Sequence, residues 1–260
     1  METWPSLDAR SGMSLVQARP VPWDTQIFGF RVASIDNLAL VDEASSHEVL
    51  NALDSWTHSN RVVLTTCRLP SANLGESMKL EGRGFHFIET VLHPFIEIDA
   101  QLRADATGIS IAHAAPADVD RLADFATRSF GFERYHADPR IDSGAANARY
   151  GHWIVDAWER ASATLLKAVD NTTGDICGFF LTSTTTPHVH WLLTAIDPVR
   201  RGEGLGKRVW SAMLDYHLER QIETVTTTIS AQNVPVMNLY ASLGFRYLPP
   251  EMTFHRLALP

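Results

Sequence analysis

One segment restricts the fold of this chain more than any other: residues 189–216 predict a strand, a glycine-rich turn and a helix in direct succession. The stretch VHWLLTAID has the apolar, β-branched character of a strand, and apolar residues recur at helical intervals from Leu205 to Tyr216. Most other predicted strands are divided only by short turns such as NTTG, residues 171–174, as in hairpins. One strand-to-helix crossover among hairpins predicts an α+β protein rather than a doubly wound sheet.

Two stretches of the chain repeat one pattern. Residues 62–89, VVLTTCRLPSANLGESMKLEGRGFHFIE, can be laid beside residues 225–251, VTTTISAQNVPVMNLYASLGFRYLPPE. Each has a threonine-rich strand, a break that contains asparagine, a short helix, and a Gly-Phe pair before another strand. The first copy has no counterpart of the glycine-rich turn, so we predict one active half and one reduced duplicate.

A short polar stretch, AQLRADATG at residues 100–108, is the best linker candidate. The sequence therefore predicts a polar leader at residues 1–17 that need not be ordered, a reduced domain at residues 18–103 and a complete domain at residues 108–260. With 260 residues and a hydrophobic content of 45%, the chain is long enough for one large domain or two small ones.

Composition excludes several classes of protein. A net charge of −8 argues against a general nucleic-acid binder, which needs an excess of lysine and arginine on one face. No apolar run reaches the roughly 18 residues of a membrane helix, and the first residues lack the apolar core of a signal peptide. We therefore expect a cytoplasmic protein without nucleic-acid or membrane partners. Cys67 and Cys177 lie in apolar, strand-like runs, which favours core positions over a disulfide or a metal site.

The glycine-rich turn, RRGEGLGK, has the composition of a phosphate-binding loop. It directs several backbone N–H groups to one point, where the dipole of the following helix also favours negative charge. A Walker loop would need glycine at position 201 and serine or threonine at 208, which hold Arg201 and Arg208. A dinucleotide fingerprint from Gly202 would need glycine where Lys207 stands. Spacing excludes both motifs.

The pattern that fits is Arg-x-x-Gly-x-Gly, at Arg201, Gly204 and Gly206, which resembles the pyrophosphate loop of the GCN5-related N-acetyltransferases (GNAT). The family's second signature resembles QNVPVMNLYASLGF, where Asn233 precedes Tyr240 by seven residues. TAIDP stands where the family's strand lends its edge to the pantetheine arm. The resemblance implies the GNAT fold, a mixed and mostly antiparallel sheet flanked by helices, with a truncated GNAT-like N-terminal domain. It also implies acetyl-coenzyme A (acetyl-CoA) as co-substrate.

Carried over to this chain, the resemblance implies a set of cofactor contacts. The backbone of the turn would bind the pyrophosphate, the main chain before the turn would contact the thioester arm, and an asparagine side chain would complete the site. The implied cofactor-binding residues are Thr194, Ala195, Ile196, Arg201, Gly202, Glu203, Gly204, Leu205, Gly206, Lys207 and Asn233.

Tyr240 is the predicted catalytic residue, because the resemblance places it next to the thioester sulfur. Aminolysis of a thioester expels a thiolate, and a positioned phenol can protonate it. The alternative is a half-buried helix aromatic. The general base stays open, since the strand TVTTTIS has no carboxylate where many relatives carry glutamate. A water chain is the first choice and His190 the second, although His190 also fits a hydrogen-bonded histidine of the sheet.

The rest of the chain resembles the bacterial dTDP-fucosamine acetyltransferase group, through VPWDTQIFGFRVASI, RSFGFERYHADP and ARYGHWIVDAW. Its members N-acetylate a 4-amino-4,6-dideoxy sugar on dTDP. The resemblance covers most of residues 18–257 but is local outside the cofactor motifs. His136 and Asp138 have no paired ligand motif, so we expect a loop there and no metal. The candidates for contact with the acceptor, all of which also fit core positions, are Trp23, Phe28, Arg134, Tyr135, Arg140 and Trp153.

Together these patterns predict an acetyl-CoA-dependent N-acetyltransferase, in which a neutral amine attacks the thioester directly. The favoured partner is a small-molecule amine on a nucleotide-linked amino sugar, a dTDP-amino sugar by the resemblance. The alternatives are a peptide, amino acid or antibiotic amine as acceptor, or a non-catalytic acyl-CoA-binding protein. Paired sheets would also permit a homodimer.

Overall fold

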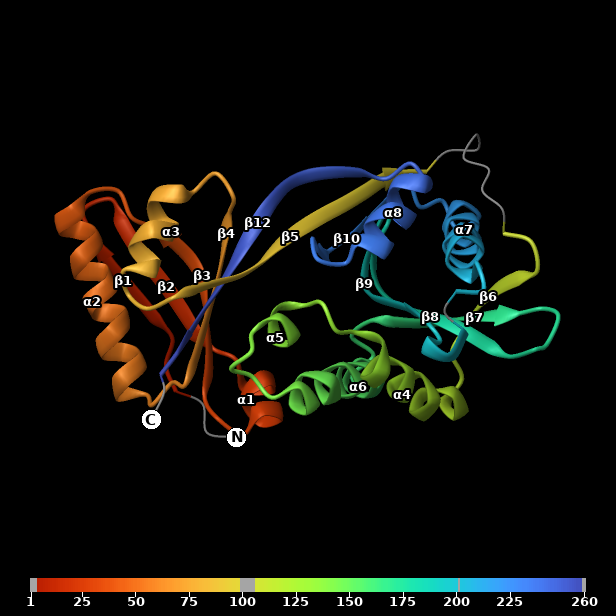
Figure 1. The fold of residues 1–260 in the computed structure, drawn as a ribbon, viewed down its shortest axis with the longest axis horizontal. Helices are drawn as coiled ribbons and strands as arrows, with labels where there is room; N and C mark the ends of the chain where they lie inside the picture. Colours follow the sequence, from red (N-terminus) through yellow and green to blue (C-terminus); the bar gives the residue numbers. More distant parts are fainter. Residues whose placement is uncertain (1–3, 99–105, 201, 259–260) are drawn as a thin grey trace. The chain divides into compact units, whose positions relative to one another are not determined.

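The computed structural model describes residues 4–98, 106–200 and 202–258 (Figure 1). Contacts divide the chain into two compact units. Unit 1 comprises Met1–Val91 and Pro249–Pro260, and unit 2 comprises Leu92–Leu248. Two long strands, β5 (His86–Glu97) and β12 (Arg246–Leu257), contribute residues to both units. Among the helices of the described residues, none is both long and apolar enough to cross a membrane.

Unit 1 contains a mixed sheet in the order β1-β2-β3-β4-β12. The pair β3–β4 is parallel, and the other neighbouring pairs are antiparallel. Helix α2 packs on the sheet through Val49, Leu50 and Leu53, all buried in one apolar core. Its remaining elements are β1 (Leu7–Ser11), β2 (Ser14–Pro20), α1 (Pro22–Phe28), β3 (Val32–Ala39), α2 (Glu43–Ser59), β4 (Leu64–Pro70) and α3 (Leu74–Glu81).

In unit 2 the strand order is β5-β10-β9-β8-β7-β6, in which β9–β10 is parallel and the other pairs of known register are antiparallel. The short strand β11 (Ile229–Ser230) pairs with β5. The remaining strands are β6 (Ile109–His113), β7 (Thr164–Asp170), β8 (Ile176–Thr185), β9 (His188–Ile196) and β10 (Thr224–Thr227).

Helices cover both faces of the sheet in unit 2 (Figure 1). One apolar core joins the sheet to α7 (Leu205–Leu218) and α8 (Val234–Ser242), and another joins it to α4 (Val119–Ser129) and α6 (Ser143–Glu159). The predicted α+β fold, a mixed and mostly antiparallel sheet flanked by helices, is confirmed. The remaining short helices are η1 (Pro116–Asp118), α5 (Arg134–Ala137) and η2 (Pro198–Arg200).

The N-terminal part differs from the expectation in two places. Residues 7–20, within or next to the expected leader, form the hairpin β1–β2, because Gly12 adopts a left-handed turn (φ 53°) and the alternate residues Val16 and Ala18 are buried. The segment FGFRVASI, residues 28–35, reads as a strand in the sequence, but β3 begins only at Val32. Pro22 opens a helix before it, and Gly29 (φ 73°) ends that helix.

The two units repeat one local geometry. In each, a strand, a helix and a parallel strand follow in order, and the parallel strands are paired over four residues before the register ends. Arg61 (φ 50°) and Gln221 (φ 59°) end the two corresponding helices in the same left-handed conformation, and Gly84 and Gly244 recur after the next helices. The paired residues run from Val32↔Leu64 to Ile35↔Cys67 in unit 1 and from His188↔Thr224 to Trp191↔Thr227 in unit 2.

Candidate functional site

Strands β9 and β10 separate at the predicted cofactor site. Their pairing ends at Thr227↔Trp191, whereas β9 continues to Ile196 and the chain after β10 pairs with β5 through β11. Thr194 and Ala195 therefore lie on β9 beyond the last residue that pairs with β10. A strand edge of this kind offers main-chain N–H and C=O groups to an extended ligand.

A β-bulge at Leu192 sets the direction of the side chains along β9. On β8, Leu181 pairs with Leu193 and Thr182 pairs with Trp191, so Leu192 is the extra residue. Before the bulge Trp191 packs in the core with α7 and α8, and after it Leu193 packs in the core with α4 and α6. At the point where the strands separate, the bulge thus changes which alternate side chains of β9 point to which face of the sheet.

The glycine-rich turn is shaped for exposed backbone N–H groups. Gly202 (φ 88°) and Gly204 (φ 71°) adopt left-handed conformations that disfavour side chains. Gly204 is the N-cap of α7 and supplies no capping side chain, and Leu205 is buried and anchors the helix. No side chain of the described residues caps the first-turn amides of α7, which is the arrangement that an anion-binding helix start needs. The predicted contact Arg201 lies outside the described residues.

Charges around the turn are organised by Arg200. Its Nη2 lies 2.9 Å from Oδ2 of Asp170, the last residue of β7, and 2.9 Å from Glu203 Oε2, within the loop. The backbone N–H of Thr172 and the Arg200 guanidinium both lower the pKa of Asp170. The negative charge of Glu203 is thereby countered inside the loop. Lys207 is exposed and pairs with none of the described residues, so it is free to meet an anion.

Tyr240 lies on α8 and is fully buried, with its ring centroid 4.6 Å from that of Phe245. Its hydroxyl has no hydrogen-bond partner in the part of the chain that the structure describes. Burial raises the pKa of Tyr240, while the nearby polar groups of Trp210, Thr194 and Thr227 act in the opposite direction without making a hydrogen bond. Tyr240 is therefore protonated at neutral pH. A buried unpaired hydroxyl costs about 1–3 kcal/mol, which a ligand at this position would recover.

Asn233 is the N-cap of α8. Its Oδ1 accepts a hydrogen bond from the Val236 backbone N–H at 3.4 Å. The side chain therefore begins the helix that carries Tyr240, and its amide NH₂ group is not used by this bond. Asn233 combines a capping role with the geometry for a second contact.

His190 is held within the sheet. Its Nδ1 lies 2.8 Å from Thr226 Oγ1 on the neighbouring strand β10. Burial lowers the pKa of His190, and the charge of His93 on β5 lowers it further. The imidazole is consequently neutral at neutral pH.

The acceptor candidates fall into two groups. Trp23 and Phe28 belong to unit 1, where Phe28 stacks on Phe30 at 5.6 Å. In unit 2, Tyr135 is buried beneath the guanidinium of Arg134, at 4.7 Å. The remaining two candidates are Arg140 and Trp153, both in unit 2.

Asp138 and His136 do not form a joint cluster. Asp138 is buried and receives two hydrogen bonds of 2.8 Å from Arg140, whereas His136 Nε2 lies 2.9 Å from Asn147 Oδ1. Within residues 4–98, 106–200 and 202–258, no group of three or more His, Cys, Asp or Glu residues could hold a metal ion. Arg140 is thus occupied by a carboxylate of its own loop.

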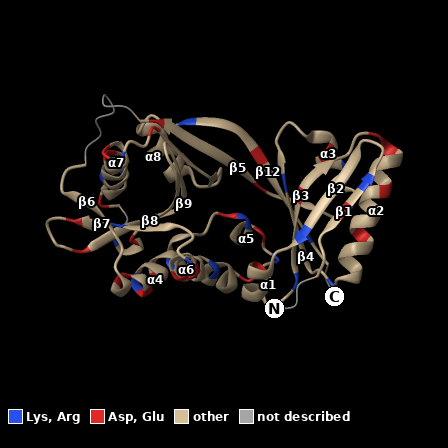
Figure 2. Ribbon diagram, turned by 180° about the vertical axis from the view of Figure 1, so that it is seen from behind, with Lys and Arg blue, Asp and Glu red and all other residues tan. Residues whose placement is uncertain are grey.

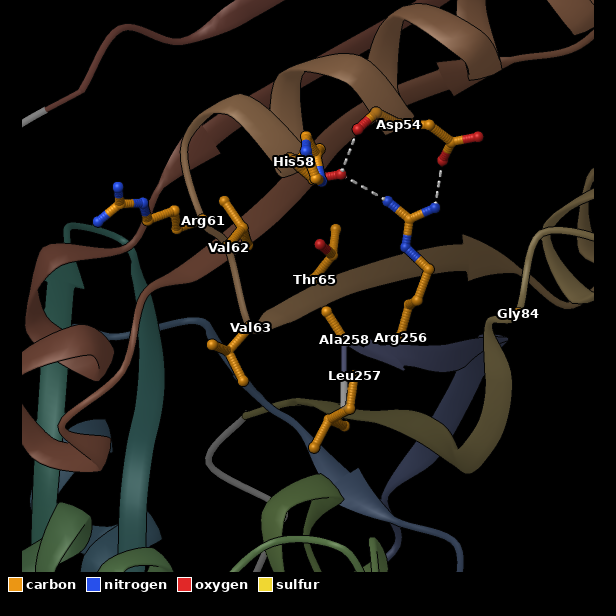
Figure 3. Close-up of a pocket in the computed structure, with 11 residues that line it drawn as sticks. Asp54, His58, Arg61, Val62, Val63, Thr65, Gly84, Arg256, Leu257 and Ala258 are labelled. Carbon is orange, nitrogen blue, oxygen red and sulfur yellow. Dashed lines mark hydrogen bonds and ion pairs between the residues drawn. The ribbon is translucent and has the colours of Figure 1, made fainter. Parts of the chain in front are cut away.

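A hollow of about 570 Å³ lies in unit 1, and none of the residues that line it is a predicted cofactor residue (Figure 3). Arg256 crosses it, paired with Asp54 and 3.1 Å from Thr57 Oγ1. Its walls include the apolar side chains of Val62 and Leu257.

Two residues that contact the candidate site residues of unit 2 were not found from the sequence, Asp170 and Thr226. The only sequence signal for Asp170 is its position directly before the turn NTTG.

The family comparison identifies the second half of the chain. Residues 120–245 match the family model described as "Acetyltransferase (GNAT) family". A mycothiol acetyltransferase from Renibacterium salmoninarum is 26% identical over 216 residues, which cover 79% of this chain and 58% of that protein. The chain therefore spans less than two thirds of the length of this curated relative. These matches do not show membership of the dTDP-fucosamine group, so that finer assignment stays a prediction.

Solved structures share the fold at low sequence identity. A GCN5-related N-acetyltransferase from Sphaerobacter thermophilus superimposes with a TM-score of 0.65 at 13% identity, covering 94% of this chain and 77% of the other. A tandem GNAT protein from the clavulanic acid biosynthesis pathway has a TM-score of 0.63 at 16% identity, covering 99% and 86%. The chain has the GNAT fold, and residues 120–245 match the model of the GNAT acetyltransferase family.

Proposed function

We propose that this chain transfers the acetyl group of acetyl-CoA to a primary amine of a small molecule. The observation that carries the proposal is the buried, unpartnered hydroxyl of Tyr240, near Thr194 on the part of β9 that β10 does not follow. The family match and the acetyltransferase relatives support the same reaction class. A proton donor placed beside an open strand edge is what release of a thiol from a thioester needs.

The residues of unit 2 fit coenzyme A. The amides at the start of α7, the left-handed Gly202 and Gly204, and the exposed Lys207 would hold the pyrophosphate. The main chain of Thr194 to Ile196 would hold the extended arm, with Asn233 as a further contact. When bound, acetyl-CoA supplies an activated acyl group.

The chain's own groups then have distinct tasks. The edge of β9 orients the carbonyl, and its backbone N–H groups stabilise negative charge on oxygen. Tyr240 holds a proton at its hydroxyl, where a leaving thiolate takes it. The amine must arrive neutral, so a separate group must accept its proton.

We infer that the acceptor is one of two candidates. The relatives named mycothiol acetyltransferase support the acceptor that those enzymes use. The segments around Trp23, Arg134 and Trp153 instead resemble the dTDP-amino sugar group. Both acceptors are small-molecule amines, so the reaction class does not distinguish them and the products must be compared.

We also propose that unit 2 carries the reaction and that unit 1 is a degenerate GNAT-like duplicate. The family match, residues 120–245, lies wholly in unit 2. The proposed domains, a reduced one at 18–103 and a catalytic one at 108–260, differ in their bounds from the compact units, because unit 2 begins at Leu92 and the segment from Pro249 belongs to unit 1. A cytoplasmic location and a homodimer stay predictions.

The test is product identification. The full chain is incubated with acetyl-CoA and a panel of amines: the acceptor of mycothiol acetyltransferases, a dTDP-4-amino-4,6-dideoxy sugar, a peptide, an amino acid and an antibiotic amine. We expect thiol release and a mass gain of one acetyl group on one of the first two. Acetylation of the peptide alone would overturn the choice of acceptor. Acetyl-CoA binding without turnover on any amine would favour an acyl-CoA-binding protein.

A further inference from the structure

The sequence of β10 offers no obvious group to receive the amine proton. Strand β10 and its continuation, TVTTTIS, contain no carboxylate. We propose that His190 is the general base of the transfer, and that Thr226 fixes the ring tautomer that makes it one. This inference rests on the proposed acetyl transfer.

The bulge in β9 places His190 on the opposite face from the proton donor. Val189 and Trp191 pack in the core with α7 and α8, so His190, between them, faces the side of α4 and α6. Beyond Leu192 the facing is reversed, and Thr194 turns toward the face that carries Tyr240. Base and acid thus approach the separated end of β9 from opposite sides. An amine attacking from the His190 side would leave the thiolate on the Tyr240 side.

The hydrogen bonds of Thr226 define the state of the ring. Its hydroxyl lies 3.4 Å from the Val189 carbonyl, to which it donates, and 2.8 Å from His190 Nδ1. A hydroxyl has one proton, so when it is donated to Val189 the same oxygen accepts from Nδ1–H. Nε2 is then unprotonated. That is the tautomer in which a histidine takes up a proton at the outer nitrogen.

The groups that face His190 leave it neutral. Its cross-strand neighbours are Ser183 on β8 and Thr226 on β10, neither of which ionises at neutral pH. His93 on β5 adds a repulsive charge, and the exposed His188 lies two residues earlier on the same strand. Burial and His93 lower the pKa of His190, so the base is ready to accept at neutral pH.

Unit 1 offers an internal contrast at this position. There Ser34 pairs with Thr66 in the register in which His190 pairs with Thr226. The threonine is retained, but serine replaces the histidine. The reduced unit therefore keeps the strand pair and lacks the base.

The experiment uses the full chain with saturating acetyl-CoA and whichever amine is acetylated, across pH 6 to 10. We expect His190→Gln to lower kcat about 10²-fold at pH 7, with the Kd for acetyl-CoA unchanged. The deficit shrinks as pH rises, because the amine then loses its proton to solvent. His188→Gln, exposed on the same strand, is the matched control and retains the wild-type profile.

A second pair of variants tests the tautomer. Thr226→Val removes the acceptor for Nδ1–H and is expected to lower kcat about tenfold, whereas Thr226→Ser restores it. A wild-type kcat and pH profile in His190→Gln would overturn the proposal, as would equal rates in Thr226→Val and Thr226→Ser. Failure of the wild-type chain to acetylate any amine would instead overturn the proposed function.

Discussion

Helices α2 and α7 follow corresponding strands in the two units, yet their N-termini are built for opposite purposes. In α2 the carboxylate of Asp42 accepts the Ser45 N–H at 2.9 Å, and Glu43 adds a second negative charge. In α7 Gly204 supplies no cap, and no acidic residue lies in the first turn. Acidic residues line α2 (Figure 2). The positive end of the helix dipole thus meets carboxylates of the chain itself in α2, whereas the first turn of α7 has none, as the proposed pyrophosphate site requires.

The next helices differ in the same sense. Tyr240 on α8 corresponds to Leu80 on α3, since each precedes by four residues the glycine that ends its helix region, Gly244 or Gly84. Leu80 occupies its buried position with an apolar side chain. Tyr240 places there a hydroxyl that has no hydrogen-bond partner among the described residues. Under the proposed function, the two units share a local scaffold and differ at the few positions to which the chemistry is assigned.

The largest expected effect comes from making α8 resemble α3. Tyr240→Phe removes only the hydroxyl, and we expect kcat to fall about 10²-fold or more while the Kd for acetyl-CoA is unchanged. Thiol release under saturating acetyl-CoA measures the rate. Tyr247→Phe is the control, because its hydroxyl donates to the Met237 carbonyl at 3.1 Å and has no proposed role. Equal rates in wild type and Tyr240→Phe would remove Tyr240 as the acid.

A smaller effect is expected from giving α7 the cap of α2. Gly204→Asp and Gly204→Asn add side chains of the same size at a left-handed position that both residues tolerate, but only aspartate is charged. We expect the Kd for acetyl-CoA to be about tenfold higher in Gly204→Asp than in Gly204→Asn, because a carboxylate at the helix start repels the pyrophosphate. Titration calorimetry at low and high salt checks this, since salt screens the repulsion and reduces the difference in Kd between the two variants. Equal Kd values would place the pyrophosphate elsewhere.

Local patterns predicted those features of unit 2 whose residues lie close together in the sequence. The turn before Leu205 and the segment from Asn233 to Tyr240 are short, and their glycine, asparagine and tyrosine positions are visible without knowledge of the pairing. The bulge at Leu192 and the bond between His190 and Thr226 depend on register between strands, which a single sequence does not specify.

Weak or non-local signals account for the other differences. The hairpin at residues 7–20 has polar residues at several alternating positions, so its periodicity is faint. The contact between Asp170 and Arg200 joins residues far apart in the chain, and no spacing rule indicates it. The helix Pro22–Phe28 is signalled only by its opening proline, which also fits a turn.

A modest effect is expected from loosening the glycine-rich turn. Asp170→Asn weakens the bridge through Arg200 to Glu203, and α2 in unit 1 has its own cap instead of such a bridge. We expect the Kd for acetyl-CoA to rise about threefold with kcat unchanged, because an ion pair positions the loop without touching the reacting atoms. Asp175→Asn, exposed in the same turn, is the control. A fall in kcat at saturating acetyl-CoA would contradict a purely positioning role.

The smallest effect on turnover is expected from the reverse change, removal of the α2 cap. Asp42→Ala leaves the α2 amides unsatisfied and should lower the melting temperature by about 2 °C, without changing kcat or adding a second acetyl-CoA per chain. Asp42→Asn keeps a capping oxygen and is the matched control.

The pH dependence of that stability difference carries the argument further. Hydrogen bonds from the Ser45 side chain and backbone lower the pKa of Asp42 from its ordinary 3.8. The folded carboxylate is thus more acidic than the unfolded one, so its stabilisation is present above pH 3.8 and is lost as pH falls through the lowered folded pKa. Thermal unfolding of wild type and Asp42→Ala should differ by a constant amount near neutral pH and converge in acid. If instead Asp42→Ala bound a second acetyl-CoA, the cap carboxylate alone would be what keeps unit 1 from being a cofactor site.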